Sequence, residues 1–166
     1  MTPLLRASGI CAIAGGLLRI ADAFTGGVLP PATLALLYLV TDVLLLTGIA
    51  GLWVARRAAV GFAGACGLAV FVIGILTVRA SAFGIGSYQL GAGVAALGLA
   101  VYALEALSRR SGDVLAPVAW LAALASGILA AMGLAPAALT AAAGVAFGSG
   151  FVAAGTALLG RRQSSR

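Results

Sequence analysis

The chain has 166 residues, of which 63% are hydrophobic and only 8% are charged, and its mean hydropathy is +1.17. A soluble domain carries about 25% charged residues, so this composition excludes an ordinary soluble protein, which would expose large apolar patches to water. The pI of about 10.7 does not indicate nucleic acid binding, because the arginines lie at the ends of apolar runs, where they orient membrane helices.

Six apolar runs follow one another along the chain and predict an all-α integral membrane bundle of six transmembrane helices. Each run has about 19–24 residues, enough at about 1.5 Å per residue to cross a hydrocarbon core of about 30 Å. Glycine and proline residues separate the runs, and no loop is long enough for a second domain, so residues 1–166 form one domain. The expected helices are 4–24, 32–54, 58–80, 88–107, 115–134 and 137–159.

The first two runs contain charged residues inside apolar sequence. The first holds Arg19 and Asp22; because Arg19 interrupts the apolar stretch, we expect a membrane helix rather than a cleaved signal peptide. The second holds Tyr38 and Asp42, and Asp42 lies about 15 Å into its helix, near the bilayer centre. A charge there costs roughly 2.5–3.5 kcal/mol, so Asp42 must be paired, hydrated or protonated.

These residues predict a polar cluster in the outer half of the bundle. Arg19 is the first expected partner of Asp42, Arg79 of the third run is the alternative, and Asp22 would hold the remaining arginine. Intramembrane ionisable residues mark functional sites, so the cluster could be a ligand or ion site or a proton relay; an ion pair that only fixes helix packing is the other interpretation. The members are Arg19, Asp22, Tyr38, Asp42, Arg79 and Tyr88.

Small residues recur at helical spacing in the later runs. Lipid tails are as apolar as leucine, so membrane helices associate through close packing and polar contacts. In the fourth run, small and polar residues form one stripe that ends at Glu105, four residues before Arg109, and this spacing predicts a local ion pair. The glycines expected to let helices approach are Gly91, Gly98, Gly144, Gly148 and Gly155.

Arginine placement predicts the orientation of the chain. The N-terminus, the second-to-third loop, the fourth-to-fifth loop and the C-terminal tail hold eight of the ten arginines, all on one side of a six-span protein. Arginine-rich loops stay in the cytoplasm, so both termini are expected there. Trp53 and Trp120 would then lie at the inner interface.

Arginine pairs ending at positions 57, 110 and 162 recur at a nearly constant interval and suggest three tandem helical hairpins. Equal hairpins under the positive-inside rule would give the same interval without duplication.

Cys11 and Cys66 fall in apolar runs and lack metal-ligand spacing, so we expect reduced, buried thiols.

Missing residue types exclude several kinds of chemistry. The sequence has neither His nor Lys, which excludes histidine-ligated haem, an HExxH zinc site, a Ser-His dyad and a retinal Schiff base. We therefore expect no metal site and no cofactor, and an enzyme is less expected than a non-enzymatic protein.

Three segments, Gly16–Ile20, Leu37–Asp42 and Gly144–Gly155, resemble small bacterial multi-pass membrane proteins. The resemblance spans most of the chain and implies a bacterial inner-membrane protein without implying an activity. The sequence favours a non-enzymatic binding protein or an accessory subunit of a membrane complex, in contact with membrane lipid, other subunits or further copies of itself. A small transporter or channel using the arginine–aspartate cluster is one alternative, and a lipid-acting enzyme with Asp42 as acid or base is another.

Overall fold

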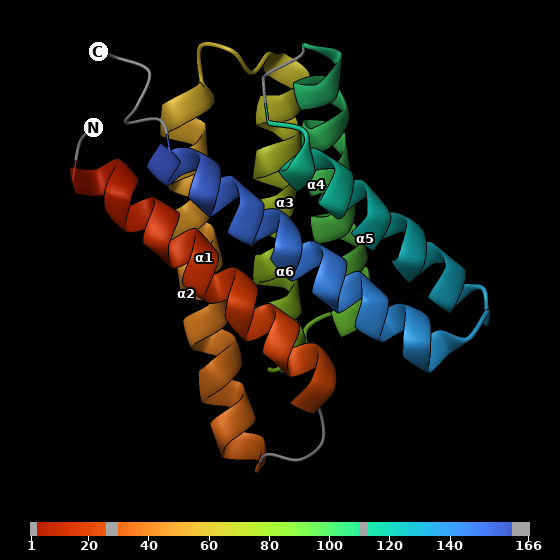
Figure 1. Ribbon diagram of the computed structural model, residues 1–166. Coiled ribbons are helices and arrows are strands. Elements are labelled where there is room, and N and C mark those ends of the chain that lie inside the picture. Colours follow the sequence, from red (N-terminus) through yellow and green to blue (C-terminus); the bar gives the residue numbers. More distant parts are fainter. Residues whose placement is uncertain (1–2, 26–29, 110–112, 161–166) are drawn as a thin grey trace.

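The computed structural model describes residues 3–25, 30–109 and 113–160, and its regular elements within these ranges are all α-helices. Five of them are long and apolar enough to cross a membrane, and α5 is a shorter apolar helix of 17 residues. The chain is therefore an all-α, multi-pass membrane protein, as the sequence predicts. The helices are α1 (Pro3–Thr25), α2 (Pro31–Arg56), α3 (Phe62–Ser81), α4 (Tyr88–Ser108), α5 (Leu115–Ala131) and α6 (Pro136–Gly160) (Figure 1).

Local sequence signals explain where these helices begin and end. The Ser87 side chain accepts a hydrogen bond of 3.1 Å from the Leu90 N–H and caps the start of α4. Helix α5 ends at Ala131, three residues before the predicted end at 134. The cause is Gly133, whose φ of +83° turns the chain, while the Leu134 N–H bonds back to the Leu129 carbonyl.

Consecutive helices pack as three antiparallel hairpins, α1–α2, α3–α4 and α5–α6. Helix α1 also packs along α6, and α4 packs on α5, whereas α2 and α3 touch only lightly. Figure 1 shows α1 and α6 crossing obliquely in front of the more upright α2 and α3, with the α5–α6 turn projecting away from the other helices. Contact between the first and last hairpins therefore closes the bundle.

Glycines bring the backbones of α1 and α6 into direct contact. A Cβ atom on Gly148 would lie 2.5 Å from the Gly16 carbonyl oxygen, and one on Gly155 would lie 2.6 Å from the Gly9 carbonyl oxygen. No larger residue fits there without separating the helices. Gly148 and Gly155 were predicted packing positions, whereas their partners Gly9 and Gly16 were not.

The other predicted glycines also lie at helix contacts. A Cβ atom on Gly91 would lie 2.5 Å from the Val78 nitrogen, and one on Gly98 would lie 2.4 Å from the Phe71 nitrogen, both on α3. Gly144 is less crowded, because its Cβ would lie 3.2 Å from the Ala23 Cβ on α1. Among the predicted glycines, the tightest approaches are thus in the α3–α4 and α1–α6 pairs.

Aromatic side chains fill the centre of the bundle. The Trp120 ring centroid lies 5.3 Å from that of Phe151 and 5.9 Å from that of Tyr102. The indole is only 1% exposed, so the prediction that Trp120 lies at the membrane interface is wrong. Gly150 explains its position, because the missing side chain lets the indole lie against α6; a Cβ there would be 2.4 Å from the indole nitrogen. Trp53, by contrast, is 40% exposed.

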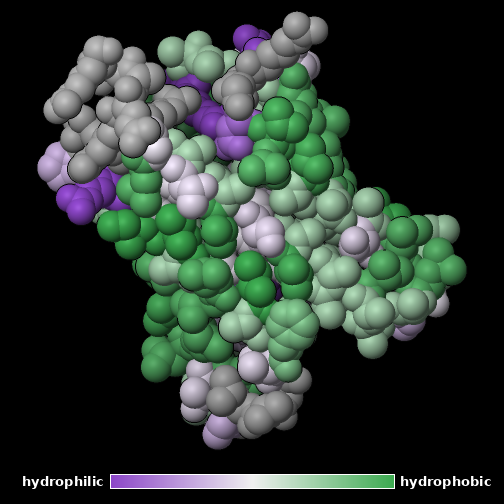
Figure 2. All heavy atoms as spheres, in the orientation of Figure 1, coloured by the Kyte–Doolittle hydropathy of each residue, from purple (hydrophilic) through white to green (hydrophobic). Residues whose placement is uncertain are grey.

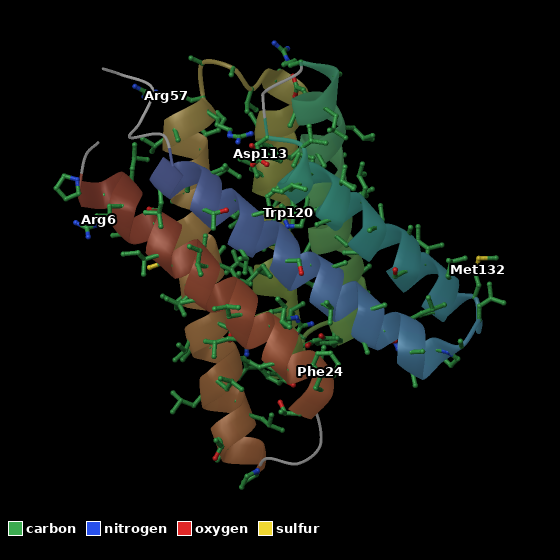
Figure 3. The ribbon with its side chains drawn as sticks, in the orientation of Figure 1. Arg6, Phe24, Arg57, Asp113, Trp120 and Met132 are labelled. Carbon is green, nitrogen blue, oxygen red and sulfur yellow. The ribbon has the colours of Figure 1, made fainter. Side chains whose placement is uncertain are left out.

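Most of the charged residues that the structure describes lie at one end of the bundle, which we call the arginine-rich end. Arg6, Arg57 and Asp113 lie near this end in Figure 3, and Figure 2 shows hydrophilic surface there above largely apolar flanks. Arg56 is buried, and its guanidinium lies 3.1 Å from Asp113, a pair that the sequence analysis did not identify. The remaining arginines predicted on this side, 110, 161, 162 and 166, lie outside the described residues.

Glu105 links two helices at the arginine-rich end. Its carboxylate lies 2.8 Å from Arg109, which is the predicted local pair. The same carboxylate also accepts a hydrogen bond from the Gly64 N–H in the first turn of α3. A negative charge stabilises the free N–H groups at a helix N-terminus, so Glu105 fixes the end of α4 to the start of α3.

Candidate functional site

The predicted polar cluster lies at the opposite end of the bundle, which we call the cluster end. Asp22 is three residues from the end of α1, Arg79 is two residues from the end of α3, and Tyr88 is the first residue of α4. Four helices thus supply the side chains. The six predicted residues are Arg19 and Asp22 on α1, Tyr38 and Asp42 on α2, Arg79 on α3, and Tyr88 on α4.

Asp42 pairs with Arg79, not with Arg19, so the first expected partner is wrong and the alternative is right. The Arg79 Nε–H donates to Asp42 Oδ2, and the guanidinium carbon lies 5.8 Å from the Tyr38 ring centroid, within cation–π range. Asp42 lies well inside α2, yet it meets the last turn of α3 because the first turns of α2 extend past the α3–α4 turn (Figure 1). The pair is therefore near one end of α3 and bridges the lightly packed α2–α3 contact.

Arg19 occupies a second, separate ion pair. One terminal nitrogen donates to Asp22 Oδ2 at 2.6 Å, and the other donates to the Tyr88 hydroxyl at 3.2 Å. A guanidinium has five N–H donors, so these two bonds leave three. The other carboxylate oxygen, Asp22 Oδ1, is buried and accepts no hydrogen bond within the described ranges. Both partners of this pair therefore retain hydrogen-bonding capacity.

A cavity of about 480 Å³ opens beside Arg19, which is the size of a typical small-ligand pocket. Its polar side is formed by part of the cluster, and its apolar side comes from the end of α1 and the first turns of α6. Arg19 and Asp22 balance each other, so the lining has no net formal charge. The lining residues are Arg19, Asp22, Ala23, Tyr38, Tyr88, Pro136, Ala137, Thr140, Ala141 and Gly144.

The pocket is suited to binding by hydrogen bonds and apolar contact. Its one aliphatic hydroxyl, on Thr140, donates to the Pro136 carbonyl at 2.6 Å and is thus bonded to its own helix. The contribution of α6 to the pocket was not predicted, and Gly144 was expected only as a packing residue. Small apolar residues at the start of a helix carry no signal that they face a pocket, and only the α1–α6 packing places them there.

The cysteines lie outside this pocket. Cys11 on α1 is half-buried, but Cys66 is exposed on the surface of α3, so the prediction of two buried thiols is wrong for Cys66.

No family model, curated protein or solved structure matches this chain.

Proposed function

We propose that this chain is a non-enzymatic binding protein of the bacterial inner membrane, with both termini in the cytoplasm. The observation that carries the proposal is the pocket at the cluster end, where an arginine, an aspartate and two tyrosines face the first turns of α6. The described arginines Arg6, Arg56, Arg57 and Arg109 support the orientation, because positive loops stay cytoplasmic. The pocket would then face the outer leaflet.

The depth of the pocket supports binding at the membrane interface. Arg19 lies six residues before the end of α1, which is about 9 Å along the helix axis. The α6 side extends from Pro136 to Gly144, a rise of about 12 Å. Because α1 and α6 run obliquely to the more upright helices (Figure 1), both segments lie less deep than these lengths along their axes, near the boundary between headgroups and hydrocarbon. Transporters place their substrate sites near the bilayer midplane, so the geometry favours binding over transport.

The chemistry of the lining also supports binding over catalysis. The Thr140 hydroxyl is held by a backbone carbonyl, and Asp22 is held by Arg19. A nucleophile normally needs a base within hydrogen-bond reach, and no such arrangement is present among the described residues that line the pocket. The polar groups can therefore orient a ligand, while the apolar side contacts its non-polar part.

Native mass spectrometry of protein purified in a mild detergent tests this proposal. We expect a noncovalent adduct on the parent chain and its loss in Thr140→Trp, because the added indole fills the pocket. Ala142→Trp is the matched control, since Ala142 is exposed on the same helix and does not line the pocket. A parent without any adduct, or equal adducts in both variants, would refute the proposal. Copurification of another membrane protein, lost in the same variant, would identify the ligand as a subunit.

A further inference from the structure

We propose that the pocket recognises a zwitterionic headgroup in which a phosphate is joined to a primary ammonium, as in phosphatidylethanolamine of the adjacent leaflet. The inference rests on the proposed binding function and adds the chemical class of the ligand. Three features of the lining carry it: the free donors of Arg19, the incomplete hydrogen bonding of Asp22, and the balance of charge.

Arg19 provides the phosphate site. Its planar guanidinium matches the oxygens of a phosphate and can form two parallel hydrogen bonds with it. Asp22 and Tyr88 each use one N–H donor and hold the group in place. The side chain is 28% exposed and lines the pocket, and we infer that a ligand reaches the remaining donors from there.

Asp22 and Tyr88 provide the ammonium site. Asp22 uses one oxygen for Arg19, while Oδ1 is buried without a hydrogen bond from the rest of the described chain. Buried polar atoms nearly always have a partner, and a rotation of the Asp22 carboxylate toward the pocket would let an ammonium donor complete its hydrogen bonding. Tyr88 also lines the pocket, and the face of a tyrosine ring attracts a cation.

Charge balance decides between lipid classes. Arg19 cancels Asp22, and Arg79 cancels Asp42. An anionic headgroup such as phosphatidylglycerol would add a negative charge that no remaining charged side chain of the lining neutralises. A phosphatidylcholine headgroup is also zwitterionic, but its quaternary ammonium has no N–H to donate to Asp22. The primary ammonium satisfies both conditions.

The apolar side of the pocket fits the remainder of a lipid. Ala137, Ala141 and Gly144 are small, and they line the pocket from the interface inward along α6. A glycerol backbone and the first acyl carbons could lie against them while the headgroup contacts Arg19. A water-soluble zwitterion shares the headgroup chemistry but lacks this apolar part, so the two sources can be separated by experiment.

The experiment is native mass spectrometry of the purified protein released from nanodiscs that contain equal amounts of phosphatidylethanolamine, phosphatidylglycerol and phosphatidylcholine. We expect the parent to retain one phosphatidylethanolamine with a preference of about tenfold over each of the other lipids. Arg19→Lys keeps the charge but loses the planar donors that hold the phosphate, and it should lower the retention of phosphatidylethanolamine. Asp22→Asn should remove the discrimination between phosphatidylethanolamine and phosphatidylcholine. Arg57→Ala, which removes an exposed arginine at the other end, should leave retention unchanged.

Tyr88→Phe provides a further variant if the changes at Arg19 and Asp22 impair folding. Tyr88 is 50% exposed, so the loss of its hydroxyl releases Arg19 with little effect on packing, and weaker retention is expected. Equal retention of all three lipids would overturn the inference, as would equal losses in Arg19→Lys and Arg57→Ala. Binding of glycerophosphoethanolamine as tight as that of the lipid would overturn the lipid source.

The outcomes also separate this inference from the proposed function. An adduct that is not a zwitterionic phospholipid, but that Thr140→Trp removes, would overturn the headgroup assignment and leave the binding function supported. A parent chain with no adduct, from either native membranes or nanodiscs, would refute both.

Discussion

Substitution of Gly98 by Ala tests how closely α3 and α4 approach. A Cβ atom there would lie 2.4 Å from the Phe71 nitrogen and 2.5 Å from the Gly67 carbonyl oxygen. Ordinary contact begins at 3.4 Å, so the two helices would have to separate by about 1 Å (3.4 − 2.4). Both obstructing atoms belong to the α3 backbone, which cannot move aside by changing a side-chain rotamer.

Gly93 offers a matched control in the same helix. It is exposed, and a Cβ atom there would meet nothing within 4 Å. Both substitutions gain the helix propensity of alanine, about 1 kcal/mol, so the difference between the variants isolates the steric cost. Overpacking costs about 1–3 kcal/mol, and rigid neighbours favour the upper half of that range. We therefore expect Gly98→Ala to be less stable than Gly93→Ala by about 2–3 kcal/mol.

The assay is equilibrium unfolding in mixed micelles by titration with sodium dodecyl sulfate, followed by circular dichroism. The two variants differ only in the position of one methyl group on α4, so composition and detergent binding are matched. Equal unfolding free energies for Gly98→Ala and Gly93→Ala would refute the close approach of α3 and α4.

Three further predictions concern the core, the ion pair and the orientation. Trp120→Ala removes a fully buried indole and should lower the unfolding free energy by about 3–5 kcal/mol in the same titration; a loss below about 1 kcal/mol would contradict its burial. A double-mutant cycle on Asp42→Ala and Arg79→Ala should give a coupling of about 1–3 kcal/mol, because each single change leaves a charge unpaired; additive effects would exclude the pair. In a cysteine-free background, an impermeant maleimide should label Ile85→Cys in spheroplasts and should label Ala58→Cys only after permeabilisation. The reverse labelling pattern would show that the protein has the opposite orientation in the membrane.

The helices could be predicted from the sequence because their signals are local. Apolar length and intervening glycine and proline residues define each membrane helix, and short loops force consecutive helices to lie antiparallel. The small and polar stripe of α4 likewise identifies the face that packs on α3, where Gly91 and Gly98 meet Val78 and Phe71. Whether the three hairpins descend from one ancestral unit stays a prediction.

The partner of Asp42 could not be predicted with the same certainty because it depends on how helices shift along one another. Depth estimated from the rise within one helix assumes that all helices start at the same level. Helix α2 instead extends past the α3–α4 turn, which brings Asp42 level with Arg79 near the end of α3 (Figure 1). Arg19 faces Tyr88 on α4 and pairs within its own helix.

The direction in which a side chain faces also could not be predicted from the sequence. Trp120 is a residue type typical of the membrane interface and lies near the end of its helix. The indole points inward because Gly150 on α6 has no side chain and leaves room for it. The same dependence on distant helices hid the apolar side of the pocket, since α6 reaches it from the far end of the chain.

The helices of this bundle differ in length by more than two turns, and this difference bears on the surrounding lipid. Helix α2 has 26 residues, α3 has 20 and α5 has 17, which correspond to about 39, 30 and 26 Å. Of these three helices, α3 matches a hydrocarbon layer of about 30 Å. Acyl chains beside α5 must therefore compress while those beside α2 must stretch or let that helix lean, each at a modest cost per ångström of mismatch. The protein consequently has no single preferred bilayer thickness, and acyl-chain length becomes a variable that sets its tilt.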